Sequence, residues 1–395
     1  MKILFLSTYY PEALLPVFKK NAKCGLDFAA HNLNVSLING FKANKVNFDI
    51  INIPHLGSFP PYSRSPFVKS FKADQVESIS YLNISYFKRW DIKRRVAKKV
   101  ENWCSNTQGN KLILLYNFDF LPLIPDLKNQ FNDLKICMLV TDLREYMAAD
   151  NSLLTQFNAT VTKLLPSDSQ IWYDALDGYI LLASKMKEKL PVGNKPWLLM
   201  EGIYNSEVDC KKIEKTLYKT ILYTGNLGQR YGLIDLLNSF SAIKSDDYRL
   251  WICGDGDSLP EYLERQKTDS RIKYFGILPR EDILKLQKQA TILINPRHSS
   301  DDYTKYSFPS KTMEYLASGT PTLMSRLECL PKEYLDHICF FEDESVEGIR
   351  DAIEKICSKP QEELNTFGER ASRFIFQEKT PKVQVKHIVD FLSKL

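Results

Sequence analysis

Residue types that can hold an anion beside a sugar occur together in one short segment, Tyr306 to Pro321, which reads YSFPSKTMEYLASGTP. Pro309 has the fixed φ angle suited to the first position of a helix, and Ser307 just before it is a residue type that caps helices. Gly319 and, two residues later, Pro321 are typical of a helix end. The segment therefore predicts a short helix that is followed by a buried strand.

The charged residues of this helix suggest a ligand. Lys311 would lie near the positive end of the helix dipole, where a cation is unfavourable unless an anion binds there. Free backbone N–H groups together with Lys311 would form a phosphate site. Glu314, about one turn further on, could accept hydrogen bonds from a sugar diol such as a ribose. A capped amphipathic helix with a surface Lys and Glu explains the same residues, and the capping pattern decides only the helix.

A second candidate phosphate contact lies in the glycine-rich turn Thr224 to Leu233, which reads TGNLGQRYGL between a predicted strand and a predicted helix. Glycines in this position let the backbone approach a phosphate, although tight turn geometry alone would also require them. Arg230 adds a guanidinium, which suits bidentate contact with a phosphate. The next predicted strand ends in a similar polar turn, Gly254 to Asp257.

The composition indicates a globular protein of two domains. The chain has 395 residues, of which 44% are hydrophobic and 12% aromatic, enough for packed cores. A net charge of +5 is too small and too localised to predict a nucleic-acid-binding protein. The eight cysteines form no CxxC pair, which predicts reduced thiols in the cytoplasm and no structural zinc. No run of 18 apolar residues is present, so we expect no transmembrane helix.

Short apolar runs alternate with helical patterns along the whole chain, which predicts two doubly wound α/β domains with parallel sheets. We expect the first domain over residues 1–200 and the second over 201–376, because a Pro- and Gly-containing stretch near residues 191–219 interrupts the pattern. Ten strands are expected: Lys2–Thr8, Phe48–Ile53, Lys111–Tyr116, Lys135–Thr141, Gly178–Leu182, Thr220–Thr224, Arg249–Cys253, Ile272–Phe275, Ile292–Asn295 and Thr320–Ser325. Four helices are expected in the second half: Asp235–Ile243, Ser258–Gln266, Arg280–Ala290 and Ser345–Ser358.

The first half contains a possible membrane contact. Residues 54–80 are rich in Pro, Ser and aromatic residues and read as a long loop. Residues 88–103 follow as a basic amphipathic helix with Ile92, Val96, Val100 and Trp103 on one face. Such a helix could lie on an anionic membrane, or it could be an ordinary surface helix with a solvated charged face.

Residues 220–326 together resemble the C-terminal domain of family 4 glycosyltransferases of the GT-B fold. The matching segments occur in the family's order: TGN, GDGD, YFG, NPR and PSK..EYLASGTP. The resemblance implies two Rossmann-like domains that face each other across a cleft. It also implies an acceptor site in the first domain, a nucleotide-sugar site in the second, and a last helix, residues 377–395, that crosses back to the first domain.

Carried over by position, the resemblance gives each residue a role. Ser310 and Lys311 would bind phosphate, and Glu314 would bind ribose. The turn residues Gly225, Asn226 and Arg230 would lie near the donor diphosphate. The full donor-binding set that we expect is Gly225, Asn226, Gly254, Tyr306, Pro309, Ser310 and Glu314.

Two positions depart from the family pattern. The family has a Glu-x7-Glu pair, but Tyr306 stands eight residues before Glu314, where the first glutamate would approach the donor sugar. A basic residue often follows the glycine-rich turn directly, and here Tyr231 holds that position next to Arg230. Donor-sugar recognition therefore cannot be copied from the family.

Asp142 is the candidate polar residue for the reaction in the first half. It follows the predicted buried strand Lys135–Thr141, and strand ends of this kind face the ligand crevice in doubly wound sheets. The family often has an Asp or His near this point, close to the reacting sugar. A helix N-cap is the alternative, because Asp often fills that position. The expected catalytic residues are therefore Asp142, Lys311 and Arg230.

The function that we expect is a retaining glycosyltransferase that needs no metal ion or other cofactor. It would move a sugar from a UDP- or GDP-sugar to a glycan or lipid-linked acceptor, in bacterial surface polysaccharide synthesis. It would work in the cytoplasm, or peripherally on the inner face of the membrane. Two alternatives stay open: a nucleotide-sugar epimerase on the same fold, and a non-catalytic binding subunit, which the Tyr306 departure keeps open.

Overall fold

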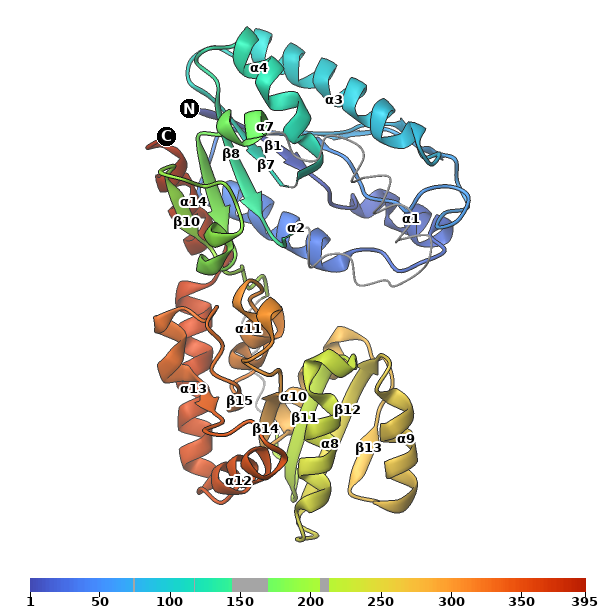
Figure 1. Ribbon diagram of the computed structural model, residues 1–395, viewed down its shortest axis with the longest axis vertical. Coiled ribbons are helices and arrows are strands. Elements are labelled where there is room, and N and C mark those ends of the chain that lie inside the picture. Colours follow the sequence, from blue (N-terminus) through green and yellow to red (C-terminus); the bar gives the residue numbers. More distant parts are fainter. Residues whose placement is uncertain (74, 117, 144–169, 207–212) are drawn as a thin grey trace. The chain divides into compact units, whose positions relative to one another are not determined.

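The computed structural model describes residues 1–395 except 74, 117, 144–169 and 207–212. The chain forms two compact units (Figure 1). Unit 1 contains Met1–Asn205 and Thr380–Leu395, and unit 2 contains Ser206–Lys379. These divisions lie close to the ones expected after residues 200 and 376.

Unit 1 is built on a sheet of eight described strands in the order β10-β9-β8-β7-β1-β2-β5-β4. All neighbouring pairs are parallel except β4 with β5. Starting from β1, the sheet grows first through β2 and β5, and then on the other side of β1 through β7. The strands are β1 (Lys2–Ser7), β2 (Phe48–Asn52), β4 (Phe71–Ala73), β5 (Val76–Ser78), β7 (Lys111–Leu115), β8 (Lys135–Val140), β9 (Gly178–Leu181) and β10 (Trp197–Leu199).

Helices cover both faces of this sheet (Figure 1). The helices are α1 (Leu15–Asn21), α2 (Phe28–Ala43), α3 (Phe87–Asn106), α4 (Ile124–Gln130), α7 (Gln170–Asp174) and α14 (Pro381–Leu392). On one face, α14 packs against α2, where Gly40 leaves room for Val385 and the Asn44 side chain donates to the carbonyl of Lys382 at 2.8 Å. The other face carries α3, whose Val96 and Val100 are fully buried. The last helix of the chain is thus part of the core of unit 1.

Unit 2 has a sheet of six described strands in the order β13-β12-β11-β14-β15-β16. All neighbouring pairs are parallel. In chain order this is 3-2-1-4-5-6, the arrangement of a Rossmann fold, and the order reverses between β11 and β14. The strands are β11 (Lys219–Asn226), β12 (Tyr248–Asp255), β13 (Ile272–Tyr274), β14 (Ile292–Asn295), β15 (Thr322–Met324) and β16 (Cys339–Phe340).

The helices of unit 2 pack on both faces of its sheet. They are α8 (Leu233–Ala242), α9 (Leu259–Thr268), α10 (Arg280–Gln289), α11 (Ser310–Ala317), α12 (Val346–Cys357) and α13 (Gln361–Glu378). Apolar side chains of α8, α9 and α12 share one core with the strands, whereas Leu286 of α10 and Tyr315 of α11 belong to a second core. Apolar side chains thus cover both faces of the sheet, as is typical of parallel sheets.

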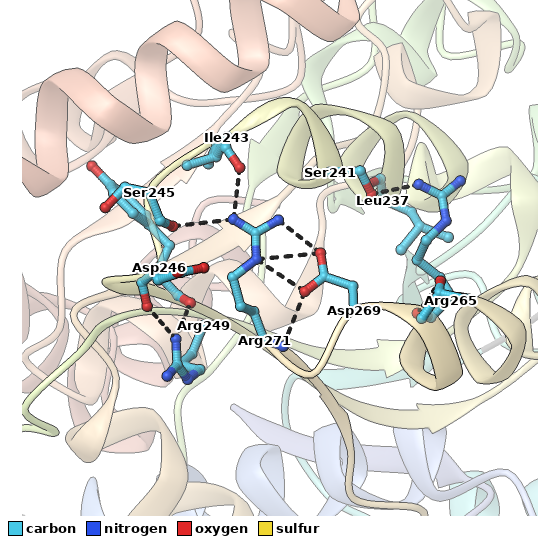
Figure 2. A network of polar contacts seen from close by, with 11 residues as sticks. Leu237, Ser241, Ile243, Ser245, Asp246, Arg249, Arg265, Asp269 and Arg271 are labelled. Carbon is cyan, nitrogen blue, oxygen red and sulfur yellow. Dashed lines mark hydrogen bonds and ion pairs between the residues drawn. The ribbon is translucent and has the colours of Figure 1, made fainter.

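A polar network closes the amino-terminal edge of the unit 2 sheet (Figure 2). The guanidinium of Arg271 donates to the carboxylate of Asp269 at 2.7 Å and to the carbonyls of Ile243 at 2.6 Å and Ser245 at 3.1 Å. This arginine therefore joins the loop after α8 to the start of β13. The network lies at the edge opposite to the glycine-rich turn, which gives it a structural role.

The ten strands expected from the sequence are all present, as are the four expected helices. The structure adds strands that the sequence did not indicate. The long loop expected over residues 54–80 contains the hairpin β4–β5, which extends the sheet of unit 1, and β3 (Phe67–Val68), which pairs with β6 (Tyr81–Leu82). These strands are only two or three residues long, too short to give a periodic pattern.

Candidate functional site

The glycine-rich turn and the start of α11 meet at the switch point of the unit 2 sheet. β11 and β14 are neighbours in the sheet, and the chain leaves each of them at its carboxyl end. Ligands of doubly wound sheets bind outside the carboxyl ends of the strands at such a point. The residues expected to bind a nucleotide sugar lie at the carboxyl ends of β11 and β12 or follow β11 and β14, so the topology places them along one edge.

Glycines allow these turns to pack directly against each other. A Cβ atom on Gly254, near the end of β12, would lie 1.7 Å from the carbonyl oxygen of Gly225, near the end of β11. A Cβ atom on Gly232 would lie 1.9 Å from the carbonyl oxygen of Pro296, after β14. Both glycines also have positive φ angles, +135° and +75°, which L side chains rarely adopt. The three turns can therefore pack together only because these positions carry no side chain.

Lys311 and Glu314 lie at this edge and contact each other. Lys311 Nζ is 3.1 Å from Glu314 Oε1, and the lysine Cε lies 3.8 Å from the place that a Cβ atom on Gly225 would take. The amide of Gln287 donates to the same Glu314 oxygen at 2.8 Å. Lys311, which is expected to bind phosphate, and Glu314, which is expected to bind ribose, thus form an ion pair over the backbone of Gly225.

The start of α11 differs in detail from the expectation. Pro309 occupies the N-cap position instead of the first helical position, and no side chain caps this helix, so the cap expected from Ser307 is wrong. The carbonyl of Pro309 accepts from the N–H of Thr312 at 2.8 Å. The first-turn N–H groups of Ser310 and Lys311 have no acceptor within the helix, because the first residues of any helix lack one. Ser310 is exposed at this end.

Arg230 is held by aromatic rings. Its Cζ lies 4.9 Å from the ring centre of Tyr231 and 5.5 Å from that of Tyr303. The Tyr303 hydroxyl also donates to the carbonyl of Arg230 at 2.9 Å. Tyr303 belongs to the loop between β14 and α11, so it connects the glycine-rich turn to the segment that carries Lys311. The guanidinium itself is exposed.

The remaining donor-site residues have clear structural surroundings. Asn226 shapes the turn, because its Oδ1 accepts from the N–H of Gly228 at 2.8 Å and its carbonyl accepts from the Tyr223 hydroxyl at 2.7 Å. Tyr306 is buried, with 7% of its surface exposed. The tyrosine that stands at the family's glutamate position therefore offers little surface to a ligand.

Sequence reasoning missed two residues that position this site. Gln287 of α10 is fully buried and holds the Glu314 carboxylate. The hydroxyl of Tyr315 accepts from the N–H of Thr224 at 2.8 Å and donates to its carbonyl at 3.1 Å, which fixes α11 to β11. A polar Gln within the apolar stripe of a helix was the available signal for the first. For Tyr315, which lies in an ordinary helical pattern, we find no such signal.

Asp142 belongs to unit 1, where it follows β8 at the carboxyl edge of the sheet. Its side chain is exposed, but the surrounding protein still limits its hydration. This desolvation, with a smaller effect of the Asp27 carboxylate, raises the pKa of Asp142 to about 6. A carboxyl group with this pKa is partly protonated near neutral pH, which suits exchange of a proton with a substrate.

Other polar groups of unit 1 share this edge. Tyr116 follows β7, and burial together with the charges of Asp27 and Asp142 raises the pKa of its hydroxyl. The hydroxyl of Tyr10, after β1, donates to the carbonyl of His55 at 2.9 Å and accepts from the N–H of Asp27. These residues follow different strands, so the edge of unit 1 presents polar groups around its own switch point between β1 and β7.

A cavity of about 610 Å³ lies elsewhere in unit 1. Its lining is mostly apolar and includes Tyr9, Ile38, Phe48, Phe71 and Val76. None of the predicted site residues lines this cavity. Within the described residues, no three His, Cys, Asp or Glu side chains come together as a metal site. The expectation of metal-independent chemistry stays a prediction.

The fold is similar to that of several solved structures. The lipopolysaccharide outer core galactosyltransferase WaaB is 14% identical with a TM-score of 0.63, and each chain is covered completely. An Anabaena HepE structure in complex with UDP is 13% identical with a TM-score of 0.63, again over both whole chains. An E. coli trehalose-6-phosphate structure with bound UDP-2-fluoro glucose is 10% identical with a TM-score of 0.65, covering 100% of this chain and 99% of the other. The fold is GT-B.

A family model describes part of the same chain. Residues 218–359 match the model for Glycosyl transferases group 1, and this range contains every residue of the candidate donor site. No curated protein matches the sequence of the chain. The family match thus concerns residues 218–359, and the similar solved structures show the GT-B fold.

Proposed function

We propose that this protein is a glycosyltransferase that moves a sugar from a nucleotide sugar to a glycan or lipid-linked acceptor. The observation that carries the proposal is the meeting of Gly225, Lys311 and Glu314 at the switch point of unit 2. The nucleotide would be a UDP or GDP group, and UDP is the nucleotide in two of the similar structures.

The donor site of the proposal follows from the chemistry of its groups. The diphosphate binds at the first turn of α11, where Lys311 and the helix dipole oppose its negative charge. Arg230 provides a second cation on the glycine-rich turn. Glu314 accepts hydrogen bonds from the ribose hydroxyls. As the bond to the sugar breaks, negative charge grows on the leaving diphosphate, and these cations stabilise it without a metal ion.

Unit 1 binds the acceptor in this proposal. Asp142 is the group that accepts the proton of the acceptor hydroxyl or orients that hydroxyl, and its raised pKa fits either role. The sugar is transferred with retention of configuration, as the resemblance to family 4 implies. A role in bacterial surface polysaccharide synthesis agrees with the similarity to a lipopolysaccharide galactosyltransferase.

A panel of nucleotide sugars tests the donor site. We expect one UDP- or GDP-sugar to raise the melting temperature and to be hydrolysed slowly in the absence of acceptor. Lys311→Ala should lower turnover about a hundredfold, the usual effect of removing one charge-stabilising donor, ~3 kcal/mol. Lys285→Ala is the matched control, because Lys285 also forms an i,i+3 pair with an acid, Asp282 at 3.0 Å, on α10.

Three outcomes would contradict the proposal. Equal turnover of the Lys311→Ala and Lys285→Ala variants would remove the phosphate role of Lys311. Conversion of the nucleotide sugar to another nucleotide sugar, with no acceptor present, would show an epimerase. Binding of a nucleotide sugar without transfer or hydrolysis under any condition would indicate a non-catalytic binding subunit.

A further inference from the structure

Three large aromatic side chains within five residues are exposed at the start of α3. Tyr86 is 87% exposed, Phe87 62% and Trp90 61%. Ile84, just before them, is 38% exposed. A globular protein rarely leaves so much apolar surface in water without a binding partner. Phe87 and Trp90 are three residues apart on the helix, so they lie on the same side of it.

The backbone holds the first of these rings outward at a cost. Tyr86 has a φ angle of +70°, and Lys45 is the one other non-glycine residue with positive φ among the described residues. For a bulky side chain this conformation is strained. The strain is not relieved by burial of the ring, so local packing does not explain it. Strain of this kind persists at sites where a side chain is needed in a particular place.

The basic residues of α3 divide into two sets. Three of them serve the fold: Lys88 Nζ donates to the carbonyl of Leu56, Arg95 Nε lies 2.8 Å from the buried Asp91 carboxylate, and Lys99 Nζ lies 2.5 Å from Glu77. The second set is exposed and consists of Arg89, Lys93, Arg94 and Lys98. The Cζ of Arg94 lies 5.3 Å from the ring centre of Trp90, so the exposed cations begin beside the exposed rings.

The outward side of this part of the helix carries more cations than anions. Between residues 84 and 100, Asp91 is the one acidic residue. It is 1% exposed and pairs with Arg95 at 2.8 Å and with Arg94 at 3.6 Å, which leaves Arg89, Lys93 and Lys98 as the other exposed cations. The positive end of the helix dipole lies at the same place. Exposed aromatic rings flanked by exposed cations match the interface of an anionic bilayer, where rings enter the headgroup region and cations meet phosphates.

We infer that the surface formed by Tyr86, Phe87, Trp90, Arg89, Lys93 and Lys98 docks on an anionic lipid surface. A highly charged polymer such as RNA would use the cations and could stack its bases on the rings, but it would give no reason for the exposed Ile84. None of the helices in the described part of the chain has the length and apolar content to span a bilayer. Contact through this surface is therefore peripheral, and it does not depend on the proposed sugar transfer.

The contacts of α3 determine which residues can be substituted in a test of lipid binding. Neutralising Arg95 or Lys88 would leave a buried carboxylate or carbonyl without its partner and would damage the fold. Arg94 also pairs with Asp91, so the test variant is Arg89→Gln/Lys93→Gln/Lys98→Gln. Phe87→Ser/Trp90→Ser is an independent variant of the rings. The control Lys244→Gln/Lys332→Gln/Lys355→Gln removes the same number of charges from exposed lysines of unit 2.

Co-sedimentation with vesicles tests the inference, in the absence of any nucleotide sugar. Vesicles of phosphatidylcholine with phosphatidylglycerol should bind the wild type, and vesicles of phosphatidylcholine alone should bind it much less. The charge variant should lose binding by about a hundredfold, on the order of fivefold for each charge, and the control should lose little. Wild-type binding should weaken as salt is added, because salt screens exposed charges. Circular dichroism should give the same melting temperature for all variants.

The insertion of the rings has its own readout. Tryptophan emission of the wild type should shift to shorter wavelength with anionic vesicles, and Phe87→Ser/Trp90→Ser should abolish the shift. Equal sedimentation of wild type and both patch variants would overturn the inference. So would binding of RNA or an acidic protein by the wild type with no binding to vesicles. Donor hydrolysis without vesicles should be unchanged in these variants, so loss of hydrolysis would concern the proposed function instead.

Discussion

The side chain of Lys311 lies over the backbone of Gly225, with the lysine Cε 3.8 Å from the place that a glycine Cβ atom would take. Lys311 follows β14 and Gly225 ends β11, two strands that are neighbours at the switch point of the sheet. The side chain of Lys311, which is expected to bind phosphate, therefore reaches from the segment after β14 to the glycine-rich turn at the end of β11. A ligand bound there would touch both segments at once.

Alanine substitutions at two glycines should distinguish an effect on ligand binding from an effect on stability. Gly225→Ala forces an L residue to a φ angle of +141°, at a cost of about 1–3 kcal/mol, but its Cβ meets only ordinary contacts. Gly254→Ala places a Cβ 1.7 Å from the Gly225 carbonyl, so the two turns must move apart. We expect Gly225→Ala to fold and to bind the nucleotide sugar less tightly, and Gly254→Ala to lower the melting temperature more. Calorimetry and thermal melts measure both; the reverse order would contradict the packing described here.

Glu314 should recognise the ribose of the nucleotide. Hydrogen bonds to a charged group contribute about 1.5–3 kcal/mol, so Glu314→Gln should weaken UDP or GDP binding by about 10- to 100-fold. The same variant should no longer distinguish the nucleotide from its dideoxyribose analogue. Gln287→Leu removes the amide that holds the carboxylate at 2.8 Å, and it should have a smaller effect in the same direction. Unchanged calorimetric affinity of Glu314→Gln would argue against a ribose contact.

Tyr303 should act as a positioning residue for Arg230. Tyr303→Phe removes one hydrogen bond, 2.9 Å long, to the Arg230 carbonyl but keeps the ring near the guanidinium. We expect a loss of donor affinity of about two- to tenfold, which corresponds to one hydrogen bond of about 0.5–1.5 kcal/mol. Tyr303→Ala also removes the ring and should lose more. Donor affinity in Tyr303→Ala equal to that of the wild type would show that Arg230 needs no support from this loop.

The sequence predicted the framework of the fold because the central strands of both units are buried on two faces. Such strands read as continuous apolar runs, as in β1, where Ile3 to Leu6 are at most 1% exposed. Short edge strands give no such signal, because β4 and β16 contain three and two residues and depend on neighbours already in place. The hairpin over residues 71–78 was for this reason expected as a loop.

The candidate site was predicted in its residues but not in its contacts. Lys311 and Glu314 were recognised from their position in a helix, yet their pairing also depends on Gln287, which comes from another helix. The expected cap by Ser307 failed because Pro309 itself takes the N-cap position. Similarly, the charges of α3 could be counted from the sequence, but their division into inward and outward sets required the packing of Asp91 and Leu56.

The pKa of Asp142 predicts how turnover depends on pH. Desolvation and the Asp27 carboxylate raise this pKa to about 6, so the proton leaves at a higher pH than from an ordinary aspartic acid. If the ionised carboxylate accepts the acceptor's proton, kcat/KM should rise with pH and level off above pH about 6. Asp142→Asn should lower transfer and abolish this rise, while donor binding in unit 2 stays the same. A pH profile of transfer, with donor affinity measured in parallel, distinguishes the two effects.

The raised pKa of Asp142 also makes the stability of the protein depend on pH, which gives an independent check on the pKa itself. A folded-state pKa above the usual value of 3.8 means that the folded protein favours protonated Asp142. The resulting stabilisation is fully present below pH 3.8 and is lost as the pH rises through about 6. Over this window the free energy of unfolding of the wild type should therefore fall relative to that of Asp142→Asn. If the free energy of unfolding of the wild type instead rises relative to that of Asp142→Asn, the folded protein stabilises Asp142 as a carboxylate. A rise of kcat/KM near pH about 6 would then have to come from another group.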